Sequence, residues 1–172
     1  SGNFSNPSAI STWNINYIPN QFECGDLDND GDQDVLSCSG ADDEIVLYEN
    51  LGAGNFSTAQ SISTLVDGPS KLEIVDFDND LDLDFICFSY SNDEIILFEN
   101  LGGGAYGPPQ VIVATSSLYT PVHLFARDMD GDGILDILTG CGNDDEISWY
   151  QNWGGGSFSP KQIISTTIDN TI

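Results

Sequence analysis

Residues 26–34 read DLDNDGDQD, so five of these nine residues are carboxylates at alternating positions. Such alternation does not follow a helix face. Five negative charges this close together repel one another strongly unless a cation lies among them. The pattern returns as DFDNDLDLD at residues 76–84 and as DMDGDGILD at residues 128–136. The chain is therefore a repeat protein with a period of about 50 residues.

The three acidic loops predict metal sites. Hard oxygen donors, with a glycine where the chain turns sharply, favour Ca²⁺, whereas Mg²⁺ keeps more of its waters and needs fewer carboxylates. An EF-hand loop would place a bidentate glutamate at its twelfth position. That position holds Ser37, Cys87 and Thr139 in turn, and the flanking segments resemble strands, so we exclude an EF-hand.

The composition is that of a folded, strongly acidic domain. Of 172 residues, 40% are hydrophobic, and 28 Asp and Glu stand against 3 Lys and Arg, which gives a net charge of −25. This charge argues against nucleic acid and anionic membrane surfaces as partners. No apolar run is long enough for a membrane span, so we expect no membrane insertion. The start lacks a leader pattern, so we expect a removed signal peptide or a sequence that begins within a longer protein.

The four cysteines do not form a zinc motif. Cys24, Cys38, Cys87 and Cys141 lack CxxC spacing, and the chain contains a single histidine, so zinc is disfavoured. Disulfides or buried free thiols remain. Of the three possible connectivities, we prefer Cys24 with Cys38 across a hairpin and Cys87 with Cys141 between neighbouring repeats.

Short apolar segments around each loop predict β-strands. Residues 44–50, 94–100 and 146–152 read EIVLYEN, EIILFEN and EISWYQN, which are rich in β-branched and aromatic residues. Each leads through a glycine-rich turn to a further strand, and the consecutive apolar positions indicate sheets covered on both faces. Four short strands per unit, without helical periodicity, predict an all-β fold of three four-stranded antiparallel blades of the β-propeller type.

We treat the chain as a single repeat domain with an extra strand at its start. The sequence GNFS at residues 2–5 returns at residues 54–57, so residues 1–20 are predicted to be an outer strand and linker of a preceding unit. Repeats follow at residues 21–70, 71–121 and 122–172. Closed propellers typically need four to eight blades. We therefore expect an incomplete propeller, or one completed by head-to-tail assembly as a ring or a filament.

A DxDxDGxxD loop between strands, followed by an apolar strand and a glycine-rich turn with an aromatic residue, resembles the FG-GAP and VCBS repeats of integrin α-chain propellers. The resemblance covers nearly the whole chain. It implies about three calcium ions, one per loop, held by the side chains at loop positions one, three, five and nine and by the backbone carbonyl at position seven. The implied side-chain ligands are Asp26, Asp28, Asp30 and Asp34; Asp76, Asp78, Asp80 and Asp84; and Asp128, Asp130, Asp132 and Asp136. The implied carbonyl ligands belong to Asp32, Asp82 and Ile134.

The second loop departs from this motif. Leu81 stands where the motif has glycine, and a residue with a Cβ is strained at positive φ. We expect the second site to be the weakest or most distorted.

Acidic pairs after each loop invite a glycosidase interpretation. The pairs are Asp43-Glu44, Asp93-Glu94 and Asp145-Glu146. Aspartate is favoured at tight turns for local hydrogen bonding, and a feature repeated in every unit is more typical of a structural role than of one active site. The single His123 and the glycine-rich turns, which lead to strands, do not support a nucleophilic triad or a phosphate site. We therefore expect no enzymatic activity.

The sequence predicts a secreted protein that works through its surface. Two sequons predict N-glycosylation at Asn3 and Asn55 if the source has a eukaryotic secretory pathway. We expect a calcium-stabilised, extracellular or cell-surface structural or adhesive module that contacts copies of itself, neighbouring repeats or another surface protein.

Two other functions remain open. A lectin-like propeller would bind glycans through aromatic stacking faces, for which the candidates are Trp13, Tyr90, Tyr119, Trp149 and Trp153. A non-catalytic part of a secreted enzyme would need a catalytic partner outside these residues.

Overall fold

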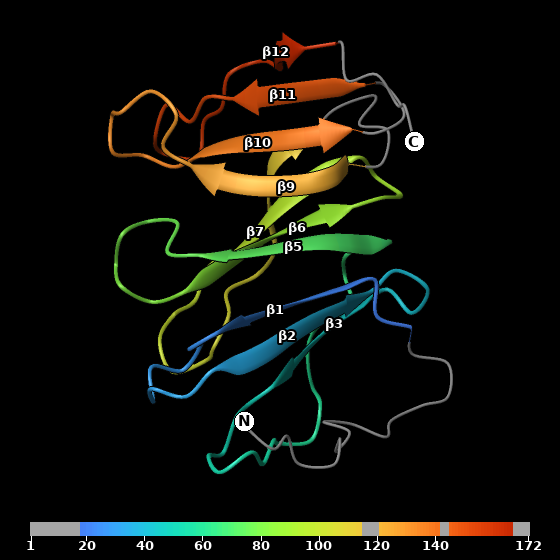
Figure 1. Cartoon of the computed structure of the whole chain (residues 1–172), viewed down its shortest axis with the longest axis vertical. Helices are drawn as coiled ribbons and strands as arrows, with labels where there is room; N and C mark the ends of the chain where they lie inside the picture. The colour runs from blue at the N-terminus through green and yellow to red at the C-terminus, as the bar shows by residue number, and fades with distance from the viewer. Residues whose placement is uncertain (1–17, 115–120, 142–144, 167–172) are drawn as a thin grey trace, which may run out of the picture.

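The computed structural model describes residues 18–114, 121–141 and 145–166. These residues form twelve β-strands joined by turns and loops (Figure 1). No helix occurs among them, so this part of the chain contains no helix able to cross a membrane. The prediction of an all-β fold is confirmed.

The strands form three four-stranded antiparallel sheets, each in chain order. We call these sheets blades 1, 2 and 3. Blade 1 contains β1 (Gln21–Gly25), β2 (Asp34–Ser39), β3 (Glu44–Tyr48) and β4 (Gln60–Ser63). Blade 2 contains β5 (Pro69–Val75), β6 (Asp84–Ser89), β7 (Glu94–Phe98) and β8 (Gln110–Ala114). Blade 3 contains β9 (Pro121–Arg127), β10 (Asp136–Cys141), β11 (Glu146–Tyr150) and β12 (Gln162–Ser165).

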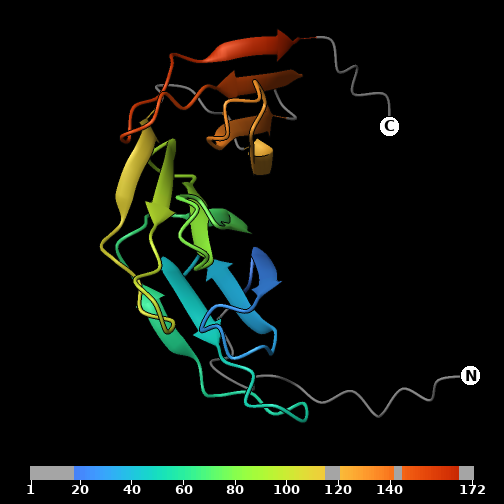
Figure 2. The same cartoon turned by 90° about the vertical axis from the view of Figure 1, so that its left-hand side faces the viewer.

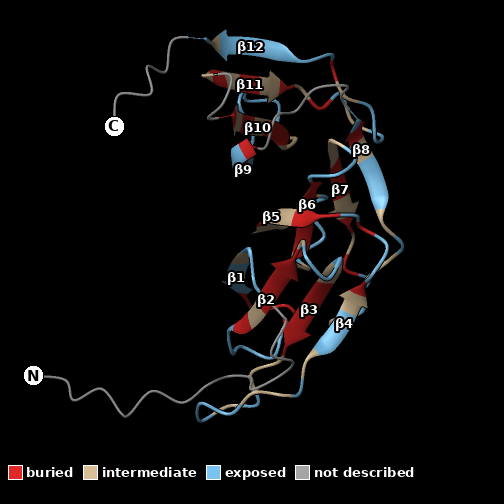
Figure 3. Cartoon of the chain, turned by 90° about the vertical axis from the view of Figure 1, so that its right-hand side faces the viewer, coloured by how far each residue is buried: buried red, intermediate tan, exposed pale blue. Residues whose placement is uncertain are grey.

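The three predicted blades are thus present, while the predicted extra strand around residues 2–5 lies outside the described residues. The blades pack face to face along an arc (Figure 2). The first strands β1, β5 and β9 follow its concave side, and β5 contacts both of the others. The last strands β4, β8 and β12 follow the outside and are largely exposed, while the middle strands are buried (Figure 3).

The hydrophobic core lies between the blades. One cluster fills the interface of blades 1 and 2, and a second fills the interface of blades 2 and 3. Every residue of β6 is buried: Phe85 and Cys87 point into the first cluster, and Ile86 and Phe88 point into the second. This alternation explains the continuous apolar run in the sequence, because the middle blade has a neighbour on each face.

The preferred disulfide pairing is wrong, because all four cysteines are free. In the first hairpin Gln21 lies opposite Cys38, and Cys24 lies opposite Val35. Side chains alternate between the two faces of a strand, so Cys24 and Cys38 point to opposite faces. Cys87 and Cys141 are likewise separated, since they belong to the first and second core clusters respectively.

Candidate metal centres

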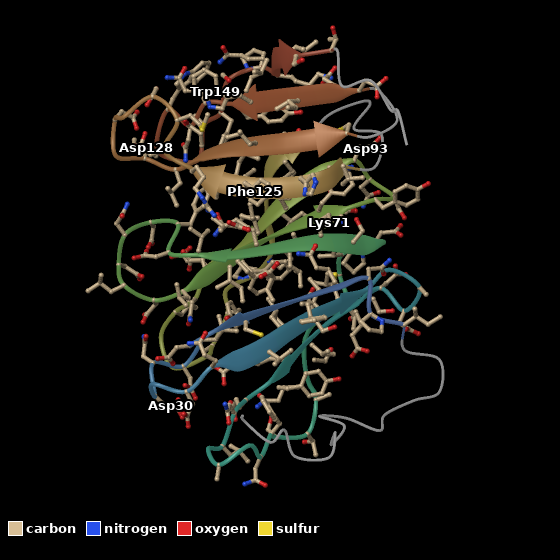
Figure 4. The ribbon with its side chains drawn as sticks, viewed as in Figure 1. Asp30, Lys71, Asp93, Phe125, Asp128 and Trp149 are labelled. Atoms are coloured by element: carbon tan, nitrogen blue, oxygen red, sulfur yellow. The ribbon has the colours of Figure 1, made fainter. Side chains whose placement is uncertain are left out.

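The three acidic loops lie along one edge of the arc. Each connects the first strand of a blade to the second, and all three lie at the left of Figure 1. In Figure 4, Asp30 and Asp128 mark this edge, whereas Asp93 marks the opposite edge. Because every blade has the same strand order, the repeat period places equivalent carboxylates at equivalent points along the edge.

Three carboxylates converge in every loop, from positions one, three and nine. In each set one oxygen of every carboxylate lies within 4.8 Å of the others. The sets are Asp26, Asp28 and Asp34; Asp76, Asp78 and Asp84; and Asp128, Asp130 and Asp136. These donors are all hard oxygen atoms, which is the chemistry that Ca²⁺ and Mg²⁺ select. The residues therefore fit a hard divalent cation.

The ninth-position carboxylate is buried and held by the backbone. In loop 1 the Oδ2 atom of Asp34 accepts a hydrogen bond from Leu27 N–H at 2.9 Å, and Oδ1 accepts one from Asn50 N–H at 2.8 Å. The equivalent aspartates of the other loops accept from Phe77 and Asn100, and from Met129 and Asn152. This aspartate thus joins the start of its loop to the end of the third strand.

Crowding of the carboxylates shows in their proton affinities. Burial raises the pKa of Asp84 to about 6, even though the N–H groups of Asn100 and Phe77 lower it, and Asp78 and Asp80 raise it further. Burial also raises the pKa of Asp28 and of Asp78, and neighbouring carboxylates add to both shifts. The raised pKa values mean that the ionised carboxylates are destabilised in these loops, and a bound cation would stabilise them.

The fifth-position carboxylates make local contacts and are not in the converging sets. Each accepts a hydrogen bond from the backbone N–H two residues later, at 2.8 to 2.9 Å. These residues are Asp30, Asp80 and Asp132. The carbonyls of the seventh residues are predicted ligands, and the side chains of these residues lie beside the glycine-rich turns. A Cβ added at Gly52 would lie 3.3 Å from Asp32 Oδ2, and one added at Gly102 would lie 3.4 Å from Asp82 Oδ2.

The sixth residue of each loop has positive φ. Its N–H donates to the first aspartate, as in the 3.0 Å bond from Gly31 to Asp26. The φ angles are 94° for Gly31, 78° for Leu81 and 88° for Gly133. The expectation that Leu81 adopts a glycine-like conformation is therefore confirmed, and the lower affinity of its site stays a prediction.

An asparagine after the third strand of each blade was missed in the sequence. Its Nδ2 donates to the carbonyl that precedes the ninth aspartate, and its Oδ1 accepts from the N–H of the glycine two residues later. These residues are Asn50, Asn100 and Asn152. Their recurrence in the pattern N-x-G is the signal that could have identified them.

Adjacent loops also contact each other across the first interface. Asn100 Nδ2 donates to Leu27 O at 2.9 Å, which links blade 2 to loop 1. The side chain of Asn29 donates to Asp82 Oδ1, which links loop 1 to loop 2. The edge that carries the acidic loops is therefore continuous between these two blades.

The aspartates of the acidic pairs lie in turns, and the glutamates begin β3, β7 and β11. Asp43, Asp93 and Asp145 have φ between 52° and 55°, and Asp43 Oδ1 accepts a hydrogen bond from Gly68 N–H at 2.8 Å. Asn55 of the second sequon is exposed in its glycine-rich turn, while Asn3 lies outside the described residues. The aspartates of the acidic pairs thus serve to form turns, and Asn55 presents an accessible side-chain amide.

A cavity of about 450 Å³ lies between β8 and blade 3. Its lining includes Ile112, Tyr150, Trp153, Phe158 and Lys161. Among the predicted stacking residues, Trp153 is 59% exposed, Tyr90 is exposed elsewhere, and Trp149 is partly buried. Trp13 and Tyr119 lie outside the described residues.

Comparisons with known proteins agree with this architecture. A family model described as FG-GAP-like repeat matches residues 26–87 and 76–139. No curated protein matches the sequence. Among solved structures, a lectin from Agrocybe aegerita aligns with a TM-score of 0.61 and 19% identity, over 86% of this chain and 38% of that lectin. Its title describes specific recognition of non-reducing terminal N-acetylglucosamine. At this identity the likeness shows the fold alone, and the chain spans well under half of the lectin's length.

Proposed function

Because this chain belongs to the FG-GAP-like repeat family, we propose that it is a non-catalytic, calcium-stabilised module of an extracellular β-propeller or repeat assembly. The observation that carries the proposal is the convergence of three carboxylates in each of three equivalent loops. The loops connect β1 to β2, β5 to β6 and β9 to β10, so a bound cation fixes the two strands nearest the concave side of every blade.

Calcium is the cation that these loops suit best. Each site offers several carboxylates, one of them buried, and calcium accepts six to eight oxygen ligands in flexible geometry, whereas Mg²⁺ requires a near-ideal octahedron and retains several waters. Extracellular modules bind calcium at about 10⁻⁴ to 10⁻³ M, a range that suits a secreted structural site. The exposed Asn55 sequon supports the same location.

Calcium-dependent melting of loop variants tests this proposal. Asp30→Ala and Asp132→Ala each remove the exposed fifth-position carboxylate, which the family motif makes a ligand although it lies outside the converging sets. They should lower the melting temperature in calcium buffer by about 3–6 °C, corresponding to about a tenfold loss of affinity. After chelation they should change it little. Asp67→Ala, an equal charge change outside the loops, is the control. An equal loss with and without calcium would contradict the ligand assignment.

The end faces of the arc support the assembly part of the proposal. Phe22 lies opposite Ser37, on the face of blade 1 turned away from blade 2, and is 65% exposed. Phe125 lies opposite Leu138, on the corresponding far face of blade 3, and is 42% exposed. Exposed apolar side chains on the terminal blades of a repeat protein are normally covered by a further repeat. Here that repeat belongs to a longer chain or to another copy.

Mass in solution distinguishes these arrangements. Light scattering of the 172-residue chain, with millimolar calcium and after chelation, should show oligomers that depend on calcium if copies assemble head to tail. A calcium-loaded, stable monomer would rule out self-assembly, and the remaining interpretation would be a module of a larger propeller.

A lectin is the second candidate function. The cavity beside Trp153 combines an aromatic face with polar atoms, which is the chemistry of many sugar sites, and the fold is shared with a lectin. Saturable binding on a glycan array that is lost in Trp153→Ala would favour this function. Assembly without sugar selectivity would favour the scaffold.

A further inference from the structure

One residue beside the candidate metal loops differs in charge between the blades. The residue that follows the third strand is Glu49 in blade 1, Glu99 in blade 2 and Gln151 in blade 3. Its backbone is equivalent in all three, because its carbonyl accepts a hydrogen bond at 2.8 Å from the N–H eight residues later. The three positions therefore compare a carboxylate and an amide in one structural setting.

In blade 3 this residue is bonded to a candidate metal ligand. Gln151 Nε2 donates to Asp130 Oδ2 at 2.6 Å, and Gln151 Oε1 accepts a hydrogen bond from Trp153 Nε1 at 3.3 Å. The amide thus occupies one oxygen of the third-position carboxylate without adding charge. It also connects the loop to the tryptophan at the cavity.

In blades 1 and 2 a carboxylate replaces that amide. A carboxylate cannot donate to the aspartate beside it, and two like charges repel. The equivalent backbone puts Glu49 and Glu99 where Gln151 reaches the third-position carboxylate of its own loop at 2.6 Å, so their charges act on the third positions of the first and second loops. Glu99 Oε2 accepts a hydrogen bond from Gln110 Nε2 at 3.1 Å.

We propose that Glu49 and Glu99 raise the cation affinity of the first and second loops, while Gln151 gives the third loop a lower cation affinity and a more stable empty state. The inference rests on the proposed calcium function. Each glutamate adds a negative charge that attracts the cation and destabilises the empty loop, and both effects tighten binding. Gln151 stabilises the empty third loop through its bond to Asp130 and contributes no attraction.

Reciprocal charge changes test the inference within each site. Glu49→Gln and Glu99→Gln should weaken one calcium step about five- to tenfold, as expected for one charge several ångströms from a divalent ion in water-like surroundings. Both should raise the melting temperature of the chelated protein. Gln151→Glu should tighten one step by a similar factor and lower the melting temperature of the chelated protein.

The measurements are calorimetric calcium titration and thermal melting after chelation. Glu44→Gln is the matched control, because it removes the same charge at the far end of the β2–β3 hairpin from the loop. The affinity changes should shrink as salt is raised from about 0.05 to 0.5 M, since screening weakens an electrostatic effect and leaves a packing defect unchanged. Indole fluorescence that follows the third-loop titration in the wild type and is lost in Trp153→Phe would assign that step.

The outcomes separate the two proposals. If calcium binds and the glutamate variants titrate like Glu44→Gln, this inference is wrong and the calcium function stands. If no variant binds calcium, the proposed function itself fails and the inference fails with it. The glutamate variants decide the result even if Gln151→Glu does not fold.

Discussion

At the scale of single residues, Leu81 shows how much the loop conformation matters. Its φ of 78° is close to that of the glycines at the same position, and its side chain is 82% exposed and contributes little packing. A left-handed conformation costs an ordinary L-residue about 1–2 kcal/mol. The second loop therefore carries strain that the first and third avoid.

Replacing Leu81 by glycine should stabilise the second loop. The released strain exceeds the entropy cost of glycine, about 0.5–1 kcal/mol, so Leu81→Gly should raise the melting temperature by about 1–3 °C and tighten one calcium step. Leu65→Gly is the control, because Leu65 is equally exposed and has no positive φ. A variant that melts at or below the wild type would refute the strain argument.

The cysteines offer a second test at this scale. Cys24 is exposed, while Cys38, Cys87 and Cys141 are buried. Burial raises the pKa of Cys38 to about 11 and also raises that of Cys87, which keeps them as unreactive thiols. Ellman's reagent should therefore modify one thiol in the folded chain and four after denaturation. Two protected pairs in the denatured, unreduced protein would restore the disulfide prediction.

At the scale of the elements, the asparagines hold each loop to its neighbouring strands and turns. Asn100 is 1% exposed, and its side chain bonds to Leu27 O, Leu83 O and Gly102 N. Asn50 makes the equivalent bonds within blade 1, to Gln33 O and Gly52 N. The additional bond of Asn100 joins two blades.

Asn100→Ala should destabilise the protein by about 2–4 kcal/mol, because it leaves buried carbonyls without their donors. Asn50→Ala should cost less, since its site is half-exposed and confined to one blade. Urea unfolding in chelator measures both without a contribution from calcium. Equal losses would show that the inter-blade bond adds nothing.

An ion pair fastens the outermost strand of blade 3. Lys161, just before β12, lies 2.8 Å from Glu146 at the start of β11, and the side chain of Ser148 also donates to Glu146. The hydrogen bond from Lys161, followed by that from Ser148, lowers the pKa of Glu146. Its stabilisation is thus fully present above the unfolded pKa of about 4.3 and is lost as pH falls through the lower folded value.

Glu146→Gln should therefore destabilise the protein by about 1 kcal/mol at pH 7 and by less at pH 3. Urea unfolding at both pH values, in chelator, provides the comparison. Glu94→Gln is the matched control, because Glu94 begins β7 and Pro109 stands where blade 3 has Lys161. A destabilisation that is constant with pH would contradict the ion-pair argument.

Much of this element structure was predictable. The β-branched runs and the glycine-rich turns predicted the strands. The repeated aspartates predicted the first, third and ninth carboxylates that converge, but also the fifth, which is not in the converging sets. The cysteine pairing was not predictable, because it depends on which face each residue occupies, and that requires the register of Gln21 against Cys38. The role of Asn100 depends on a bond to Leu27, 73 residues away, which no local pattern encodes.

At the scale of the whole molecule, the net charge and any bound calcium both affect the repulsion between negative charges in the folded chain. A chain with a charge of −25 repels itself in the compact state. Three calcium ions would contribute +6 and leave −19. Part of the stability that calcium would supply is thus a general reduction of charge, in addition to the contacts in each loop.

Salt should therefore stabilise the chelated protein more than the calcium-loaded one. Raising the salt concentration from about 0.05 to 0.5 M shortens the screening length from above 10 Å to below 5 Å, so the melting temperature in chelator should rise by several degrees. Tetramethylammonium chloride should act like sodium chloride if screening is the cause. A melting temperature that is unchanged or falls would rule out self-repulsion as a major term.

The alternation along β6 has a consequence for how this sequence can change over time. Phe85 packs in the core that blade 2 shares with blade 1, and Ile86 packs in the core that blade 2 shares with blade 3. A substitution at Phe85 should therefore be compensated in blade 1, and a substitution at Ile86 should be compensated in blade 3. Consecutive positions of β6 should therefore covary with partners in opposite directions along the chain. A duplicated copy of one repeat would carry its own side of each core, but not the matching residues of the neighbouring blades.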